Sequence, residues 1–250
     1  MIPFAKELLI DKINEYNLII KEKQINDYSI RKVPYFKDKI VGYLYEKNEE
    51  LDIEILELTK GNEVLMRIDP KDIQGSFESI KRSKGRVGVV GLGLGYVVHE
   101  MASRDEVTEI IVYEISEEIV SLYNENFGDN PKIKILTEDA YNAESDTFDF
   151  FFVDTYGYEL SEDVVEDYIK FNELHEIDEY SFFGLEHFLL SCSYEEIIWV
   201  YIPENWMIMS KNIFEALDTF GILEHYKKLD EELVSEILAS FKMIFNEDDE

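Results

Sequence analysis

Three acidic residues that follow short apolar stretches are the best placed in this chain to do chemistry. Glu114 and Asp154 each end a run of apolar residues, and Asp139 comes shortly after a third run. A carboxylate at the end of a strand can accept hydrogen bonds from hydroxyl or amine groups, and it can take up a proton as a general base. The spacing therefore indicates a small-molecule site built from strand ends.

A glycine-rich turn precedes these acids and narrows the choice of ligand. It reads G-x-G-x-G, with glycines at Gly91, Gly93 and Gly95. A dinucleotide loop reads G-x-G-x-x-G, and its third glycine is replaced here by Tyr96 in one register and by Val98 in the other. The run predicts a tight turn that a ligand can approach closely. Glu114 follows it at about the distance where an acid accepts hydrogen bonds from ribose hydroxyls in nucleotide-binding sheets.

Alternating strands and helices must position these residues. The pattern predicts a strand over 87–91, a helix over 95–104, a strand over 109–114, a helix over 116–127, and strands over 132–136 and 148–153. Ser116 is a suitable N-cap for the second helix, and Gly128 is a suitable stop. This order is typical of an α/β, Rossmann-like, mostly parallel sheet with helices on both faces, which binds ligands at the carboxyl ends of its strands.

The flanking segments carry weaker patterns. Before the glycine turn we expect a helix over 3–24 and a small antiparallel sheet of strands 40–45, 51–58 and 64–68, with residues 74–80 leading into the turn. After Asp154 we expect helices over 161–176, 179–191, 210–219 and 229–245, with a strand over 196–202. These elements divide the chain into an N-terminal part (1–83), a sheet domain (84–245) and an acidic tail (246–250) that is predicted to be disordered.

The composition excludes some partners and favours others. The 55 acidic residues outnumber the 24 Lys and Arg residues and give a net charge of −31, so a nucleic-acid partner is disfavoured while a cationic small molecule or a basic protein is steered favourably. Because Cys192 is the only cysteine, no disulfide forms within the chain, which fits a reducing compartment. With no signal peptide, apolar span or zinc-type spacing in the sequence, we expect a cytoplasmic protein without a metal site.

Four segments together resemble a known family. They are Val87 to Tyr96, Val107 to Ser116, Glu138-Asp-Ala140 and Phe148 to Asp154. They are similar to the core of class I S-adenosylmethionine (SAM) dependent methyltransferases, and most similar to the spermidine synthase-like branch, the aminopropyltransferases. That branch also has an apolar residue, here Val89, where most methyltransferases carry an acid.

The resemblance implies a transferase with SAM as its cofactor and a role for each motif residue. Gly91, Gly93 and Gly95 would line the methionine and ribose end of the ligand. Glu114 would hold the ribose hydroxyls, Asp139 would face the adenine amine, and Asp154 would sit at the reacting centre. In the spermidine synthase-like branch the upstream antiparallel sheet forms a lid or an oligomer contact, which is compatible with a homodimer.

Departures from the pattern separate three hypotheses for the function. Leu94 and Thr155 stand where aminopropyltransferases usually carry acids, which favours a methyltransferase acting on an amine or hydroxyl of a small molecule or protein. An aminopropyltransferase that uses decarboxylated SAM is the second hypothesis. A nucleoside-binding module without catalysis is the third.

Each site residue also has a purely structural interpretation. The glycines could form a bare turn, Glu114 could be a solvated strand-end acid, and Asp154 could cap the next segment instead of orienting an acceptor amine. Glu138 could contact adenine in place of Asp139. The aromatic residues Tyr156 and Tyr158 could wall the acceptor pocket or pack on the core.

Overall fold

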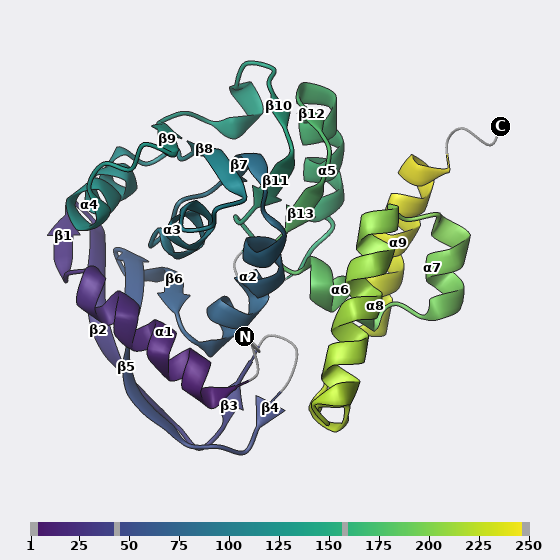
Figure 1. The fold of residues 1–250 in the computed structure, drawn as a ribbon, viewed down its shortest axis with the longest axis horizontal. Helices are drawn as coiled ribbons and strands as arrows, with labels where there is room; N and C mark the ends of the chain where they lie inside the picture. Colours follow the sequence, from purple (N-terminus) through teal and green to yellow (C-terminus); the bar gives the residue numbers. More distant parts are fainter. Residues whose placement is uncertain (1–4, 43–45, 157–159, 247–250) are drawn as a thin grey trace.

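A parallel five-stranded sheet forms the centre of the molecule in the computed structural model, which describes residues 5–42, 46–156 and 160–246 (Figure 1). The strand order is β13-β11-β7-β8-β9, and every neighbouring pair is parallel. The strands are β7 (Gly85–Val90), β8 (Val107–Tyr113), β9 (Ile133–Leu136), β11 (Phe150–Val153) and β13 (Tyr180–Phe182). The predicted fold class is confirmed.

The order in which strands are added to the sheet reverses at β7, although all the strands stay parallel. From β7 it runs outward through β8 to β9, and it then returns to the other side of β7 to form β11 and β13. The β7 and β11 residues pair in register, with Val90 opposite Val153. Such a switch point leaves a crevice beyond the carboxyl ends of the two central strands, where open α/β sheets bind their ligands.

The helices that follow β7 and β8 begin at the residues the sequence indicates. Helix α3 (Tyr96–Ala102) starts after Gly95, and helix α4 (Glu117–Phe127) starts after Ser116, whose hydroxyl accepts a hydrogen bond from Ile119 N–H at 3.2 Å. Gly128 ends α4 at a φ of 66°. The predicted cap and stop are therefore confirmed.

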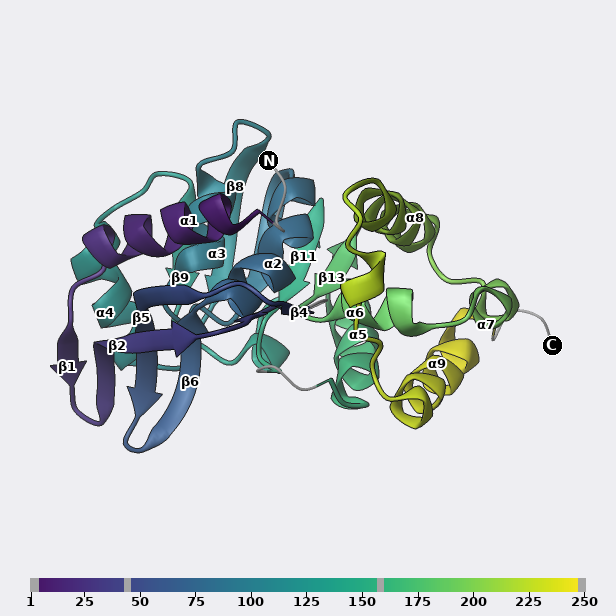
Figure 2. The ribbon, with the colours of Figure 1, turned by 90° about the horizontal axis from the view of Figure 1, so that it is seen from below.

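The N-terminal region contains more structure than the sequence predicts. Helix α1 (Lys6–Ile19) lies over an antiparallel sheet of order β1-β2-β5-β6 (Figure 2). The strands are β1 (Lys23–Ile25), β2 (Tyr28–Lys37), β5 (Leu51–Lys60) and β6 (Glu63–Ile68), and helix α2 (Pro70–Arg82) follows them. A two-residue pair, β3 (Ile40–Val41) with β4 (Glu46–Lys47), lies beside them.

Three predictions in this region need correction. The first helix ends at Ile19, because Ile20 is already extended and β1 begins at Lys23. Strand β2 was not predicted, and residues 70–82 form a helix where only a connection to the glycine turn was expected. Of the strand expected over 40–45, only Ile40 and Val41 are extended as β3, and residues 43–45 lie outside the described part of the chain.

The C-terminal region is a group of helices beyond the β13 edge of the sheet (Figures 1 and 2). Its helices are α5 (Asp163–Leu174), α6 (Leu185–Ser191), α7 (Tyr194–Val200), α8 (Glu204–Thr219) and α9 (Glu231–Phe245). The short elements of the second half are β10 (Thr147–Phe148), which pairs with β12 (Glu176–Ile177), and the 3-10 turns η1 (Ala140–Asn142) and η2 (Leu223–His225). Helix α9 packs against α5, α6 and α7.

Two C-terminal predictions are wrong for local reasons. Residues 196–202 were expected as a strand, but Ser193 and Glu196 form a capping box that starts helix α7 at Tyr194. The helix expected over 179–191 is split into strand β13 and helix α6, because Gly184 turns the chain at a φ of 111°. None of the helices in the described ranges is long and apolar enough to cross a membrane. The predicted tail lies outside those ranges from residue 247 onward.

Candidate functional site

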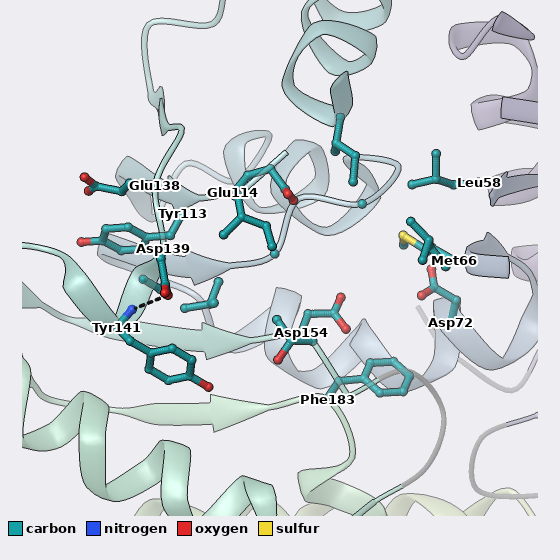
Figure 3. Close-up of a pocket in the computed structure, with 18 residues that line it drawn as sticks. Leu58, Met66, Asp72, Tyr113, Glu114, Glu138, Asp139, Tyr141, Asp154 and Phe183 are labelled. Atoms are coloured by element: carbon teal, nitrogen blue, oxygen red, sulfur yellow. Dashed lines mark hydrogen bonds between the residues drawn. The ribbon is translucent and has the colours of Figure 1, made fainter. Parts of the chain in front are cut away.

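A cavity of about 500 Å³ lies at the carboxyl ends of β7, β8 and β11 (Figure 3). Five of the six site residues predicted from the sequence line it: Gly91, Gly93, Glu114, Asp139 and Asp154. Gly95 does not line it and instead forms the N-cap of α3. The topology therefore brings the strand-end acids to one place.

The three glycines of the turn are required by the protein's own packing. All three have positive φ, and a side chain at Gly91 would come within 2.6 Å of the Asp154 carbonyl oxygen. A side chain at Gly93 would overlap Met66 Sδ, and one at Gly95 would come within 2.5 Å of the Tyr123 ring. The run thus shapes a loop that leaves a cavity beneath it, and this explains its spacing without any ligand.

Glu114 ties together two loops at the centre of the cavity. One carboxylate oxygen accepts the Leu92 N–H at 3.0 Å, and the other accepts the Ser116 N–H at 2.9 Å. The side chain is buried, and its carboxylate is visible between the two ends of the cavity in Figure 3. Each carboxylate oxygen can accept a further hydrogen bond, so a fixed Glu114 remains able to receive a pair of hydroxyl groups.

Asp139 and Glu138 share the β9 side of the cavity with aromatic and apolar residues. The Asp139 carboxylate accepts hydrogen bonds from Tyr141 N–H and Asn142 Nδ2, both at 3.0 Å, and so caps the 3-10 turn η1. Glu138 also lines the cavity. Tyr113 and Ile115 provide apolar surface beside them, which suits a flat ring.

Asp154 lies at the end of β11 with its carboxyl group directed into the cavity (Figure 3). Its backbone N–H bonds the Val90 carbonyl oxygen at 2.9 Å, whereas none of the described residues donates a hydrogen bond to its side chain. The next helix, α5, has Glu162 at its N-cap. Burial raises the pKa of Asp154 to about 7. Among the described residues, the Asp154 carboxyl group therefore does not cap a helix.

Asp72 is a cavity residue that the sequence analysis did not identify. It lies in the first turn of α2, its side chain is 3% exposed, and its Oδ2 atom has no hydrogen-bond partner among the described residues. Burial, the nearby Asp154 and the nearby Asp69 together raise the pKa of Asp72 well above its ordinary value. The sequence could have indicated helix α2, because Asp69 is an N-cap followed by Pro70, but no motif directs Asp72 toward the site.

Met66 and Leu58 also reach the cavity from outside the predicted motifs. They come from β6 and β5 of the antiparallel sheet. The Leu94 N–H is directed at Met66 Sδ, at 3.1 Å, so the antiparallel sheet contacts the glycine turn directly. This sheet therefore forms one wall of the site.

The aromatic residues after Asp154 do not wall the cavity where they are described. Tyr156 does not line the cavity, and its hydroxyl donates a hydrogen bond to the buried Asp167 of α5 at 2.6 Å. The Tyr141 hydroxyl donates to the other oxygen of Asp167, so this acid connects α5 to the cavity wall. Tyr158 lies outside the described residues.

Comparison with known proteins finds similar solved structures, whereas no family model and no curated protein matches the sequence. A spermidine synthase from Thermotoga maritima aligns at 12% identity and a TM-score of 0.39, over 63% of this chain and 53% of the other. A ribosomal protein L11 methylase from Lactobacillus delbrueckii subsp. bulgaricus aligns at 17% identity and a TM-score of 0.37, over 58% and 66% of the two chains. The 23S rRNA methyltransferase ErmE aligns at 21% identity and a TM-score of 0.32, over 40% and 39%.

This chain thus spans between 39% and 66% of the length of these three structures. Their names fall into the two groups that the sequence motifs resemble, methyltransferases and spermidine synthases. At these identities and TM-scores, function has to be argued from the chain's own residues.

Proposed function

We propose that this chain is a transferase that binds SAM or a closely related adenosyl sulfonium and transfers an alkyl group to an acceptor. The observation that carries the proposal is Glu114, which two backbone amides hold at the switch point of the sheet beside an open cavity. A carboxylate held in this way is pre-organised for a ribose diol, because it loses little freedom when the hydroxyl groups bind. The principal candidate is methyl transfer to a small-molecule or protein acceptor.

The rest of the cavity fits an adenosyl sulfonium on either side of Glu114. The apolar surface of Tyr113 and Ile115, with Glu138 and Asp139 at its edge, would hold the adenine ring and its amine. The sulfonium would supply an alkyl carbon that is activated for in-line displacement, with a neutral thioether as leaving group. Asp154 would accept a hydrogen bond from the acceptor and stabilise the positive charge that develops there, so most of the catalysis is positioning.

One observation favours the second candidate, aminopropyl transfer from decarboxylated SAM. The described residues around the cavity include five acids and no Lys or Arg. The α-carboxylate of SAM therefore has no cationic side chain to bind there, and the Leu94 N–H beside the cavity is already directed at Met66 Sδ. The acids of the cavity would also repel that α-carboxylate. Decarboxylated SAM lacks this group and so avoids the repulsion.

Calorimetry and thermal shift on the purified protein test the proposal. We expect SAM, S-adenosylhomocysteine or decarboxylated SAM to raise the melting temperature, since a ligand at about 100 times its Kd stabilises the folded state by about 2.7 kcal/mol. NAD serves as the control, because the glycine turn lacks the pyrophosphate fingerprint. If none of the three ligands binds to the folded protein, the proposal is wrong. Tighter binding of decarboxylated SAM than of SAM would select aminopropyl transfer.

A further inference from the structure

The two acids at the end of the cavity away from Glu138 form an unusual pair. The carboxyl groups of Asp72 and Asp154 point toward one another in Figure 3, although they come from α2 and from the end of β11. Asp72 is almost fully buried, and its Oδ2 atom has no partner in the described chain. A buried acid oxygen without a donor is costly, and proteins retain such groups where a ligand supplies the missing partner.

The surroundings of the pair are acidic and apolar. The groups that raise the pKa of Asp72 electrostatically are Asp154 and Asp69, and no basic group among the described residues offsets them. Asp69 is itself engaged, because its carboxylate accepts the N–H groups of Lys71 and Asp72. Tyr96 also faces Asp72 from α3, and as a phenol it brings no positive charge. The remaining walls at this end are Leu58, Met66 and Phe183.

These features define the chemistry of the missing partner. Two carboxyl groups that face one cavity can bind a cation with several N–H donors, and they do so strongly where water is excluded. The apolar walls suit the methylene groups that carry such a cation. An anionic group would meet only like charges at this end, and a neutral hydroxyl compound would leave at least one acid without a counter-charge.

We propose that Asp72 and Asp154 form a two-carboxylate seat for an aliphatic ammonium group of the acceptor. This inference rests on the proposed function and names its acceptor class as an amine. Asp72, which neither the sequence motifs nor the comparisons assign, binds the cation, and Asp154 faces the reacting nitrogen.

The transfer step balances with these two acids. The ionised Asp154 takes one proton from the bound ammonium and leaves a neutral amine whose lone pair attacks the carbon on sulfur. The new C–N bond forms as the C–S bond breaks, and the electron pair of that bond leaves with the neutral thioether. The positive charge thus moves from sulfur to the alkylated nitrogen, which stays beside Asp72.

A binding experiment with matched small molecules tests the seat. The purified full chain is saturated with S-adenosylhomocysteine and titrated with n-butylamine, 1-butanol and butyrate by calorimetry. We expect binding of the amine alone. We also expect that binding tightens as the pH rises from 6 to 8 and that it releases protons, because the cation replaces protons on the acid pair. The proton release is measured as a dependence of the heat on the ionisation enthalpy of the buffer.

Substitutions separate Asp72 from the general acidity of the protein. Asp72→Asn should weaken n-butylamine binding by at least about 10-fold, which is the cost of losing one charge-assisted contact. Glu78→Gln removes one charge from the same helix away from the cavity, and it should bind the amine as the wild type does. Binding of S-adenosylhomocysteine to each variant shows that it is folded.

The outcomes separate this inference from the proposed function. If S-adenosylhomocysteine binds but n-butylamine binds no better than 1-butanol, the cation seat is wrong and the nucleoside site stands. Equal amine affinity in the wild type and in Asp72→Asn would also overturn the role of Asp72. If none of S-adenosylhomocysteine, SAM and decarboxylated SAM binds, the proposed function fails first. If Asp72→Asn does not fold, the wild-type protein still tests the inference. Binding of n-butylamine to the wild type without release of protons would contradict the two-carboxylate seat.

Discussion

The two ends of the cavity are built on opposite principles. At the proposed ribose position, both oxygens of Glu114 already accept backbone N–H groups, so the carboxylate is fixed before any ligand arrives. At the proposed acceptor position, Asp72 Oδ2 has no donor among the described residues, and Asp154 lies beside it. The fold itself supplies hydrogen-bond donors to the acid at the first end, whereas the acids at the second end need a ligand to balance their charge.

This difference separates recognition from reactivity. A fixed acceptor such as Glu114 gives affinity and orientation, because its hydrogen-bond geometry is set by the loops after β7 and β8. An acid whose pKa lies near neutrality, such as Asp154, can exchange a proton with a bound group at the operating pH. If the comparison is right, substitutions at the two ends must affect different measurements.

The largest effect is expected at Asp154, on turnover. Asp154→Asn keeps the shape of the side chain and loses its ability to accept a proton, so transfer should fall by roughly 10²–10⁴-fold, the usual contribution of a general base. Affinity for S-adenosylhomocysteine should stay nearly unchanged, because Glu114 is intact. Single-turnover kinetics, with whichever sulfonium and amine the binding experiments identify, provide the measurement.

The exposed Asp178 offers a matched control at the opposite end of the strands, because the cavity lies at their carboxyl ends. It precedes β13, so Asp178→Asn removes a charge without touching the cavity and should keep the wild-type rate. A rate for Asp154→Asn within a factor of about three of the wild-type rate would show that Asp154 takes no proton. The assignment of affinity to one end of the cavity and reactivity to the other would then be wrong.

A smaller effect is expected at Glu114, on nucleoside affinity. Charge-assisted hydrogen bonds contribute about 1.5–3 kcal/mol each, so Glu114→Ala should weaken S-adenosylhomocysteine binding by on the order of 10- to 100-fold. The structure adds a second consequence. The N–H groups of Leu92 and Ser116 lose their acceptor, so the free energy of unfolding should also fall, by about 1–3 kcal/mol.

Calorimetry well below the melting temperature of Glu114→Ala separates the two consequences. A folded variant with wild-type nucleoside affinity would leave Glu114 as a purely structural connection between two loops. A variant whose affinity falls while its stability is unchanged would show that water replaces the carboxylate at both amides.

The same contrast explains how much of the molecule the sequence could predict. The last four residues of β7 and of β8, and all of β11, are buried on both faces with no polar side chain except that of Tyr113, and each strand is followed by a glycine turn or an acid. Because parallel strands place their carboxyl ends at one edge, Glu114 and Asp154 could be brought together from spacing alone. The cavity and five of its residues followed from local patterns of this kind.

The acceptor end could not be predicted in this way because its parts are remote in the sequence. Asp72 comes from α2 and Met66 from β6, and their positions depend on how the antiparallel sheet packs beside the glycine turn. Strand β2 contains Pro34 and three Lys or Arg residues, which weaken its apolar alternation, so the sheet that carries this wall was itself incompletely predicted. Tertiary contacts decide such positions.

The smallest effect is expected in the stability of the unliganded protein and in its dependence on pH. The folded-state pKa values of Asp72 and Asp154 lie above those of an unfolded chain, so the folded protein binds more protons between about pH 4 and pH 7. The stability that Asp154 contributes is therefore present at low pH and is lost as the pH rises through about 7, and the contribution of Asp72 changes in the same direction.

Asp72→Asn removes one of these acids and the repulsion between the two. We expect Asp72→Asn to be more stable than the wild type at pH 8, on the order of 1–2 kcal/mol, and this difference should shrink toward pH 5. Urea denaturation at both pH values measures it, and Asp178→Asn, a change at an exposed acid outside the cavity, should show a difference from the wild type that hardly changes with pH. An Asp72→Asn variant that is destabilised equally at pH 5 and pH 8 would mean that Asp72 is already paired in the folded protein, and the acceptor end would then be as self-sufficient as the ribose end.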